Sequence, residues 1–282
     1  MAVEADEAGG IDLKRLEAIL QQFDITIAEA NDLVDLDNHS FVILADDSGS
    51  MKNSSLSAEE LNSNAEPRSR FDEARQAASM IIEMASCFSD RGTDLYFCNR
   101  RSRQHIKSMN DEEFQRAFDK LPSGPSNLGQ RILEVGERAA VRMGVERPIL
   151  IFVLTDGLVD KQDLFENNVE ALMKKKTKAK GNFKLQLMAC TSNAEDAEWL
   201  SQLEYKFEAV DCIDDYQEEL KQVIRARKTK TFTRGDWVLK AMLGPISKKH
   251  DNLDEGGLLV NLSEVTNWTG ACPCCTKLLG MK

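Results

Sequence analysis

The sequence predicts an α/β protein with a doubly wound, mainly parallel and open β-sheet that carries helices on both faces. Short apolar runs typical of buried parallel strands alternate with amphipathic stretches of a dozen or more residues. Two of these runs, FVILA at 41–45 and PILIFVL at 148–154, lead directly into carboxylate-bearing segments, as strands do at the edge of a sheet. Because such alternation requires crossover connections, neighbouring strands are expected to be parallel.

The same patterns place the individual elements. The first helix begins after Asp12, whose carboxylate can cap it, and has its leucines and isoleucines on one face. Further helices are expected over residues 70–88, 111–120, 128–143, 164–178, 194–203, 214–228 and 236–243, and strands over 41–45, 93–98, 148–154, 183–189 and 207–213. We therefore predict an acidic leader with a docking helix over 1–38, a central domain over 39–230 and a partly disordered extension over 231–282.

Composition excludes several function classes. With 36 Lys and Arg against 47 Asp and Glu, the net charge of −11 disfavours binding to nucleic acid. No apolar run approaches the roughly 20 residues that cross a bilayer, so no membrane-spanning segment is expected. The start, MAVEADEAGG, lacks the features of a secretory signal, and most of the 7 cysteines stand singly, which favours reduced thiols. These observations predict a cytoplasmic protein.

Three polar segments are candidates for a common site. Asp46, Ser48 and Ser50 follow the first strand, Ser126 lies in the GPSN loop before a helix, and Asp156 follows the PILIFVL strand. Because ligands of doubly wound sheets bind outside the carboxyl ends of strands, these segments are expected to meet. They offer only oxygen ligands, which hard divalent ions prefer, so we expect Mg²⁺, with Mn²⁺ or Ca²⁺ as alternatives.

These motifs resemble the metal-ion-dependent adhesion site (MIDAS) of von Willebrand factor A (VWA) domains, whose pattern is Asp-x-Ser-x-Ser, a separate Thr and a later Asp. The matching segments are DDSGSM at 46–51, GPSN at 124–127 and TDG at 155–157, and the resemblance covers roughly residues 40–228. It implies that Asp46, Ser48, Ser50, Ser126 and Asp156 form the metal site. The stretches SRFDEARQAA and DRGTDLYFCN look like those of intracellular members. One departure is Ser126, which stands where Thr is usual and has a less fixed rotamer.

The resemblance implies a non-enzymatic module that binds an Asp or Glu of a partner protein through the metal ion. In that family the hydroxyls usually contact the ion, and the carboxylates act directly or through water. One alternative is a Mg²⁺-dependent phosphotransferase or phosphatase of the haloacid-dehalogenase type. Such enzymes need a second acid two residues after the first, where this chain has Ser48. The other alternative is a scaffold with a vestigial ion site, which would bind its partner through the terminal helices.

Two further groups of residues bear on chemistry. Cys272, Cys274 and Cys275 form a single cluster and lack the second pair that a structural zinc site usually has. The three histidines are scattered, form no evident catalytic triad with a serine, and are expected at the surface.

Overall fold

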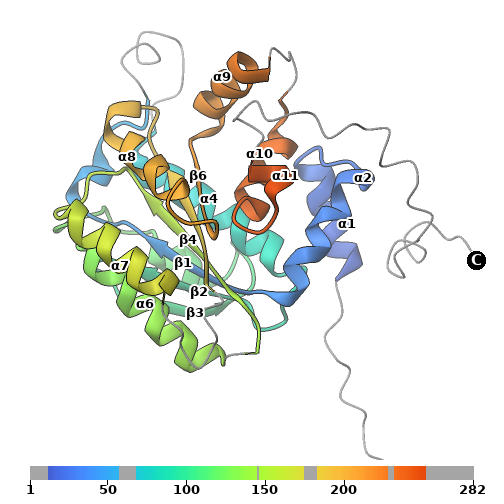
Figure 1. The fold of residues 1–282 in the computed structure, drawn as a ribbon. Coiled ribbons are helices and arrows are strands. Elements are labelled where there is room, and N and C mark those ends of the chain that lie inside the picture. Colours follow the sequence, from blue (N-terminus) through green and yellow to red (C-terminus); the bar gives the residue numbers. More distant parts are fainter. Residues whose placement is uncertain (1–11, 57–67, 145, 175–182, 228–231, 252–282) are drawn as a thin grey trace, which may run out of the picture.

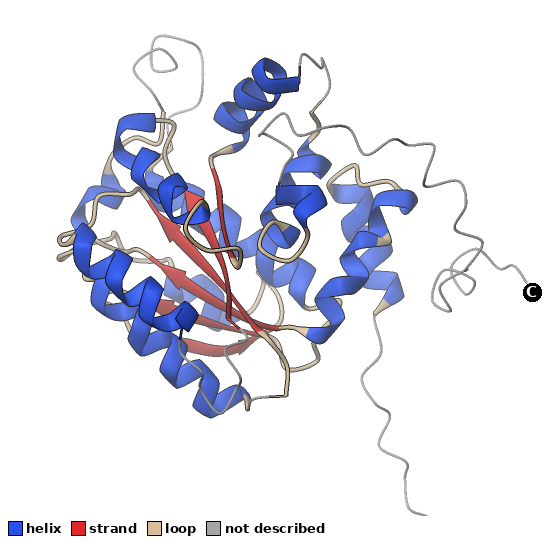
Figure 2. Ribbon diagram, viewed as in Figure 1, coloured by secondary structure: helices blue, strands red, loops and turns tan. Residues whose placement is uncertain are grey.

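The computed structural model of the chain has the expected α/β fold, with helices on both faces of a six-stranded sheet (Figures 1 and 2). It describes residues 12–56, 68–144, 146–174, 183–227 and 232–251. The strands are β1 (Ser40–Ala45), β2 (Thr93–Phe97), β3 (Arg103–Ile106), β4 (Ile149–Thr155), β5 (Phe183–Ala189) and β6 (Val210–Ile213). Their order in the sheet is β3-β2-β1-β4-β5-β6, and every neighbouring pair is parallel except β2 and β3.

The helices agree closely with the pattern of apolar residues. They are α1 (Leu13–Gln22), α2 (Ile27–Ala30), η1 (Asp32–Asn38), η2 (Gly49–Lys52), α4 (Arg70–Ala85), α5 (Glu112–Ala117), α6 (Leu128–Met143), α7 (Gln162–Lys174), α8 (Ala194–Glu204), α9 (Tyr216–Arg227), α10 (Arg234–Leu243) and α11 (Lys248–Asp251). Capping boxes set three of the helix starts, since Thr26 exchanges hydrogen bonds with Glu29, Ser69 with Asp72 and Thr233 with Asp236.

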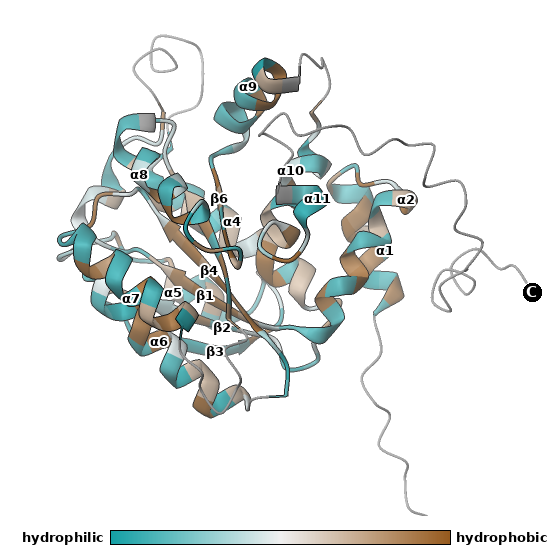
Figure 3. Ribbon diagram, viewed as in Figure 1, coloured by the Kyte–Doolittle hydropathy of each residue, from teal (hydrophilic) through white to brown (hydrophobic). Residues whose placement is uncertain are grey.

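A separate hydrophobic core lies on each face of the sheet. Successive side chains of a strand point to opposite faces, so Phe41 and Ile43 of β1 belong to one core and Val42 and Leu44 to the other. The first core is covered by α1, η1, α4, α5 and α10, and the second by α6, α7 and α8. Figure 3 shows the strands as mainly hydrophobic between helices with polar outer surfaces. The long apolar runs are therefore explained by burial on both faces.

Segments from both ends of the described chain complete the first core. Leu33 and Leu36 of η1 and Val238 and Met242 of α10 are fully buried in the same cluster as β1 and α4. Figure 1 shows α10 beside the helices of the N-terminal segment. Residues on either side of 39–230 thus share a core with it. The first eleven residues and the cluster of Cys272, Cys274 and Cys275 lie outside the described residues.

Two histidines are buried, which corrects the expectation that all three lie at the surface. His39 is 7% exposed and its Nδ1 lies 2.9 Å from the carbonyl oxygen of Asp35. His250 is 4% exposed and its Nε2 lies 2.9 Å from a carboxylate oxygen of Asp32. A hydrogen-bond partner near each ring makes burial tolerable, and such a partner cannot be read from a local pattern.

The strand order places a topological switch point between β1 and β4. From β1 the chain moves outward through β2 and β3, then returns to β4 on the other side of β1. Doubly wound sheets bind ligands outside the carboxyl ends of the strands at such a switch point. None of the described helices is long and apolar enough to cross a membrane.

Candidate metal site

Asp46 lies at the centre of the site. Its backbone N–H donates to the carbonyl of Leu154 at 2.8 Å, which continues the pairing of β1 with β4 and buries the side chain completely. One carboxylate oxygen accepts the Ser48 backbone N–H at 2.8 Å. The other accepts the Ser126 hydroxyl at 2.7 Å and the Thr155 hydroxyl at 3.4 Å. Donors from all three predicted segments therefore converge on this one carboxylate.

The electrostatic environment of Asp46 favours a nearby positive charge. Burial raises the pKa of Asp46 to about 6, the hydrogen bonds from Ser126 and Ser48 act in the opposite direction, and the negative charge of Asp156 raises the pKa further. A positive charge near this carboxylate would offset both its lost hydration and the repulsion between the two acids.

Ser48 and Ser50 form the open side of the site. Their hydroxyl oxygens lie 3.1 Å apart at the start of η2. Ser48 is buried, whereas Ser50 is partly exposed and Gly49 is exposed. The Gly49 backbone N–H donates to the carbonyl of Gly124 at 2.9 Å, which ties this turn to the GPSN loop. The solvent-exposed edge of this group of residues is therefore at Gly49 and Ser50.

The GPSN loop is fixed against the end of β1. Ser123 donates its N–H to the carbonyl of Asp47 at 2.8 Å, and Ser126 is 4% exposed. Gly124 has a φ of +102°, and a Cβ there would lie 2.9 Å from the side-chain oxygen of Asn99. A glycine is needed for this close approach to Asn99 and for the positive φ.

Asp156 is fully buried and both of its carboxylate oxygens already accept donors. Oδ1 accepts the Leu158 N–H at 3.0 Å, and Oδ2 accepts a guanidinium N–H of Arg70 at 2.9 Å. The adjacent Gly157 has a φ of +81°, and a Cβ there would lie 2.1 Å from the carbonyl oxygen of Asp196 in α8. The TDG turn is thus pressed against α8 and its acid is held from two sides.

Asp47, the neighbour of Asp46, is engaged away from the hydroxyls. Its Oδ1 accepts the backbone and side-chain N–H groups of Asn99 at 2.8 and 3.2 Å, and its Oδ2 pairs with the Arg100 guanidinium at 3.2 Å. Asp46, Asp47 and Cys98 place potential ligand atoms within 4.8 Å of one another. Burial raises the pKa of the Cys98 thiol, as do the charges of both acids, so the thiol stays protonated and is a poor ligand.

The predicted residues therefore fit a hard divalent cation. Carboxylate oxygens and neutral hydroxyls meet at one strand edge, and this is the donor set that Mg²⁺, Mn²⁺ and Ca²⁺ prefer. No local pattern in the sequence indicates the supporting contacts of Thr155, Asn99, Arg100 and Asp196. Arg70 gave only a weak signal, the arginine-aromatic pair that opens α4. These contacts join residues far apart in the sequence, and no local spacing reveals them.

A separate groove of about 1150 Å³ runs along α4, and its lining includes none of the predicted metal-site residues. Apolar side chains such as Met80, Met188 and Trp237 line it together with charged groups of both signs, among them Arg75 and Asp72. The predicted metal-site residues therefore lie outside this groove.

Comparison with known proteins adds no assignment. No protein-family model matches the sequence, and a search of curated proteins finds no match.

Proposed function

We propose that the protein is a VWA-type binding module in which Asp46, Ser48, Ser50, Ser126 and Asp156 hold a divalent ion, most simply Mg²⁺, that engages an Asp or Glu of a partner protein. The observation that carries the proposal is the fully buried Asp46 carboxylate, on which donors from three strand-end segments converge. The switch point between β1 and β4 supports it, since these segments lie where such sheets bind ligands.

The hydrogen bonds leave the serine hydroxyl oxygens of the site able to act as metal ligands. Ser126 donates its hydroxyl proton to Asp46 at 2.7 Å, which leaves the oxygen lone pairs available to a cation. Ser48 and Ser50, with oxygens 3.1 Å apart, can present lone pairs to the same point. Because hydroxyls are neutral, a bound Mg²⁺ would keep enough positive charge to attract a carboxylate from the open side.

Specific observations favour a binding module over the alternative phosphotransferase. The position two residues after Asp46 is Ser48, whose backbone N–H orients Asp46 and whose side chain carries no proton donor of acidic pKa. Both oxygens of Asp156 are engaged by Leu158 and Arg70, so this acid is poorly placed to transfer protons. Measured phosphate release from generic phosphoesters that depends on Asp46 would favour the enzyme instead.

The proposal includes a cytoplasmic location. The described cysteines Cys87, Cys98, Cys190 and Cys212 are free and buried, which supports a reducing compartment.

The test is a comparison of proteins captured from native lysate in Mg²⁺ and in chelator, identified by mass spectrometry. Wild type and Ser48→Ala are compared, with Ser102→Ala, in the turn before β3, as the matched serine control. We expect a set of proteins that wild type and Ser102→Ala retain only with Mg²⁺ and that Ser48→Ala loses. Capture of the same proteins in every lane would contradict metal-gated binding.

A further inference from the structure

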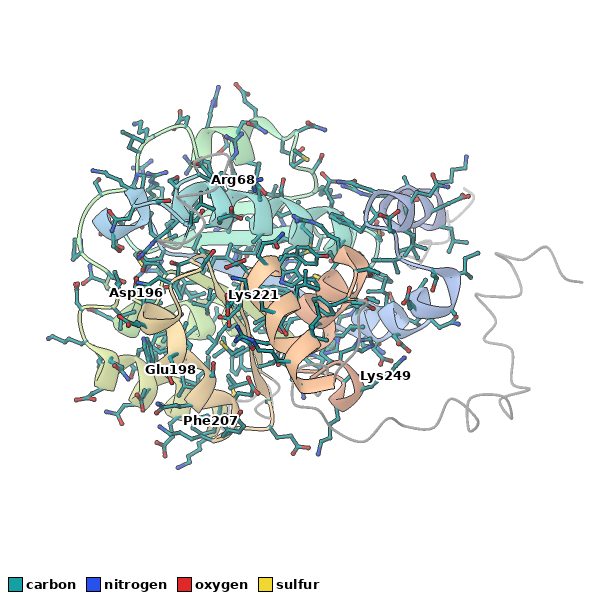
Figure 4. All side chains as sticks on the ribbon, turned by 90° about the horizontal axis from the view of Figure 1, so that it is seen from above. Arg68, Asp196, Glu198, Phe207, Lys221 and Lys249 are labelled. Atoms are coloured by element: carbon teal, nitrogen blue, oxygen red, sulfur yellow. The ribbon has the colours of Figure 1, made fainter. Side chains whose placement is uncertain are left out.

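Helix α4 begins with a buried arginine that joins three parts of the molecule. Arg70 is 6% exposed, and its guanidinium pairs with Asp156 at 2.9 Å and with Asp196 at 2.7 Å. Its Nε donates to the carbonyl of Ser54 at 3.3 Å. Asp196 is in the first turn of α8 and is labelled in Figure 4. One side chain thus connects the TDG turn of the metal site, α8 and the segment after η2.

The planar guanidinium is suited to this position. It directs separate N–H groups at two carboxylates and one carbonyl, whereas the ammonium group of lysine is a single point charge. Breaking a buried ion pair by removing one partner leaves an uncompensated charge, so Asp156 depends on Arg70 for its burial. Arg70 is therefore more than a surface charge that happens to lie near the site.

The contacts also restrict Asp156. Leu158 N–H holds Oδ1 at 3.0 Å and Arg70 holds Oδ2 at 2.9 Å, so neither oxygen is free to turn without losing a hydrogen bond. A carboxylate held in this way contributes its charge to the site while a water molecule can lie between it and an ion. The cation of Arg70 also opposes the approach of a second cation.

We propose that Arg70 is a positioning residue of the ion site, a proposal that rests on the proposed function. Arg70 holds Asp156 outside direct contact with the ion, and its own positive charge keeps the affinity for the ion low. In the metal-free protein Arg70 serves as the counter-charge that keeps Asp156 in place. Removing it releases Asp156 toward the ion.

Removing Arg70 is expected to change ion affinity in the opposite direction from the loss of a purely structural residue. If Arg70 only anchored α4, its loss would loosen the site and weaken ion binding. If it restrains Asp156, its loss strengthens ion binding and replaces a coordinated water by a carboxylate oxygen.

The experiment is a Mn²⁺ titration of wild type, Arg70→Met and Arg70→Lys, with bound Mn²⁺ counted by electron paramagnetic resonance. The number of waters on the bound ion is measured by water-proton relaxation. We expect Arg70→Met to bind Mn²⁺ about tenfold more tightly, because a unit of repelling charge is removed, and to carry fewer ion-bound waters. Arg70→Lys, which keeps the charge, is expected to stay near wild type in affinity.

Two controls keep the comparison interpretable. Asp196→Asn removes the negative charge that pairs with Arg70 on α8 while leaving the contact of Arg70 with Asp156, and it should lower the melting temperature with little change in Mn²⁺ affinity. If Arg70→Met does not fold, Arg70→Gln removes the charge with a polar side chain and carries the same expectation of tighter binding.

A charge-removing variant, Arg70→Met or Arg70→Gln, that folds and binds Mn²⁺ as weakly as wild type, or more weakly, would overturn the inference. Absence of Mn²⁺ binding by wild type would instead overturn the proposed function, and this inference with it. The two failures are distinguishable because one appears in the Arg70 variants and the other in wild type.

Discussion

At the scale of single residues, the candidate site is built around a carboxylate that is costly to bury. Asp46 has no exposed surface, and its compensation comes from the Ser48 N–H and the hydroxyls of Ser126 and Thr155. Burying a charge is unfavourable unless it is paired and hydrogen-bonded. The donors satisfy the hydrogen-bonding part of this need, and the missing positive charge is what a divalent ion would supply.

The hydroxyl of Ser126 is expected to matter more than the rest of its side chain. Ser126→Ala removes the donor 2.7 Å from Asp46 and one proposed ligand, so it should weaken Mn²⁺ binding by about tenfold or more, or about 1.4 kcal/mol. Ser126→Thr keeps the hydroxyl and should retain binding. Titration of both variants by calorimetry checks this, and equal affinity of Ser126→Ala and wild type would remove Ser126 from the ligand set.

Asp214 provides a pH-dependent contribution to stability. Burial raises its pKa to about 6, and the charges of Asp215 and Glu218 add to the increase, while Gln222 and Lys240 act in the opposite direction. Because the folded-state pKa lies above the unfolded value of 3.8, the folded protein holds the proton more tightly. Asp214 therefore costs stability as pH rises from about 4 to 6, and the cost persists above that range.

We expect Asp214→Asn to raise the free energy of unfolding at pH 7.5 by about 1–2 kcal/mol, which is less than the full shift implies because the side chain is partly exposed. At pH 4 the gain should disappear. Urea unfolding at both pH values measures this, and a gain independent of pH would contradict the explanation.

At the scale of elements, the site depends on tight contacts between turns and helices. The TDG turn rests against α8, where Gly157 faces the Asp196 carbonyl and its own carbonyl accepts the indole N–H of Trp199 at 3.0 Å. Helix α10 is fixed to α9 by the ion pair of Lys240 with Glu219 at 2.6 Å, both side chains 1% exposed. Each contact gives an element-level prediction.

Gly157→Ala should destabilise the protein by at least about 2 kcal/mol, since the left-handed backbone disfavours any Cβ and the new atom meets the Asp196 carbonyl. Thermal unfolding measures the loss. Gly144→Ala is the matched control, because Gly144 has a φ of +76° but nothing within 4 Å of an added Cβ. Equal losses in the two variants would show that the packing against α8 contributes nothing.

Lys240→Met should destabilise by about 3–5 kcal/mol, because it leaves Glu219 charged and buried without its cation. Lys221→Met is the control on α9, where the ion pair with Glu218 is partly exposed and worth less than about 1 kcal/mol. Chemical denaturation of both variants provides the comparison. A small loss in Lys240→Met would mean that α10 is held by its apolar face alone.

The spacing of apolar residues predicted most helices and strands, because neighbouring residues in the sequence largely determine which of the two forms. The apolar alternation located five of the six strands, and α6 begins and ends where its spacing predicted. The short edge strand β3 was not predicted, because its residues are largely polar and partly exposed. The start of α10 was placed too late, since the Thr233 capping box begins the helix at Arg234. The short helices α2, η1, η2 and α11 were not anticipated because they depend on packing and turns more than on a repeating pattern.

At the scale of the whole molecule, the sheet order explains why motifs distant in sequence meet. The fold class and the three site segments were predictable because each segment ends a strand or lies in a loop at the same sheet edge. The contacts that hold the site were not, since Arg70 reaches Asp156 across 86 positions and Asp196 across 126. Such pairings are specified by the folded sheet and its covering helices.

The most direct test of the account is calorimetric titration of Mn²⁺ into wild type and Ser48→Ala, both verified as folded by circular dichroism. The account predicts saturable binding of one ion by wild type and at least about tenfold weaker binding by Ser48→Ala, equal to about 1.4 kcal/mol. Indistinguishable titrations, or no heat of binding in wild type, would contradict the claim that this strand edge is a metal site.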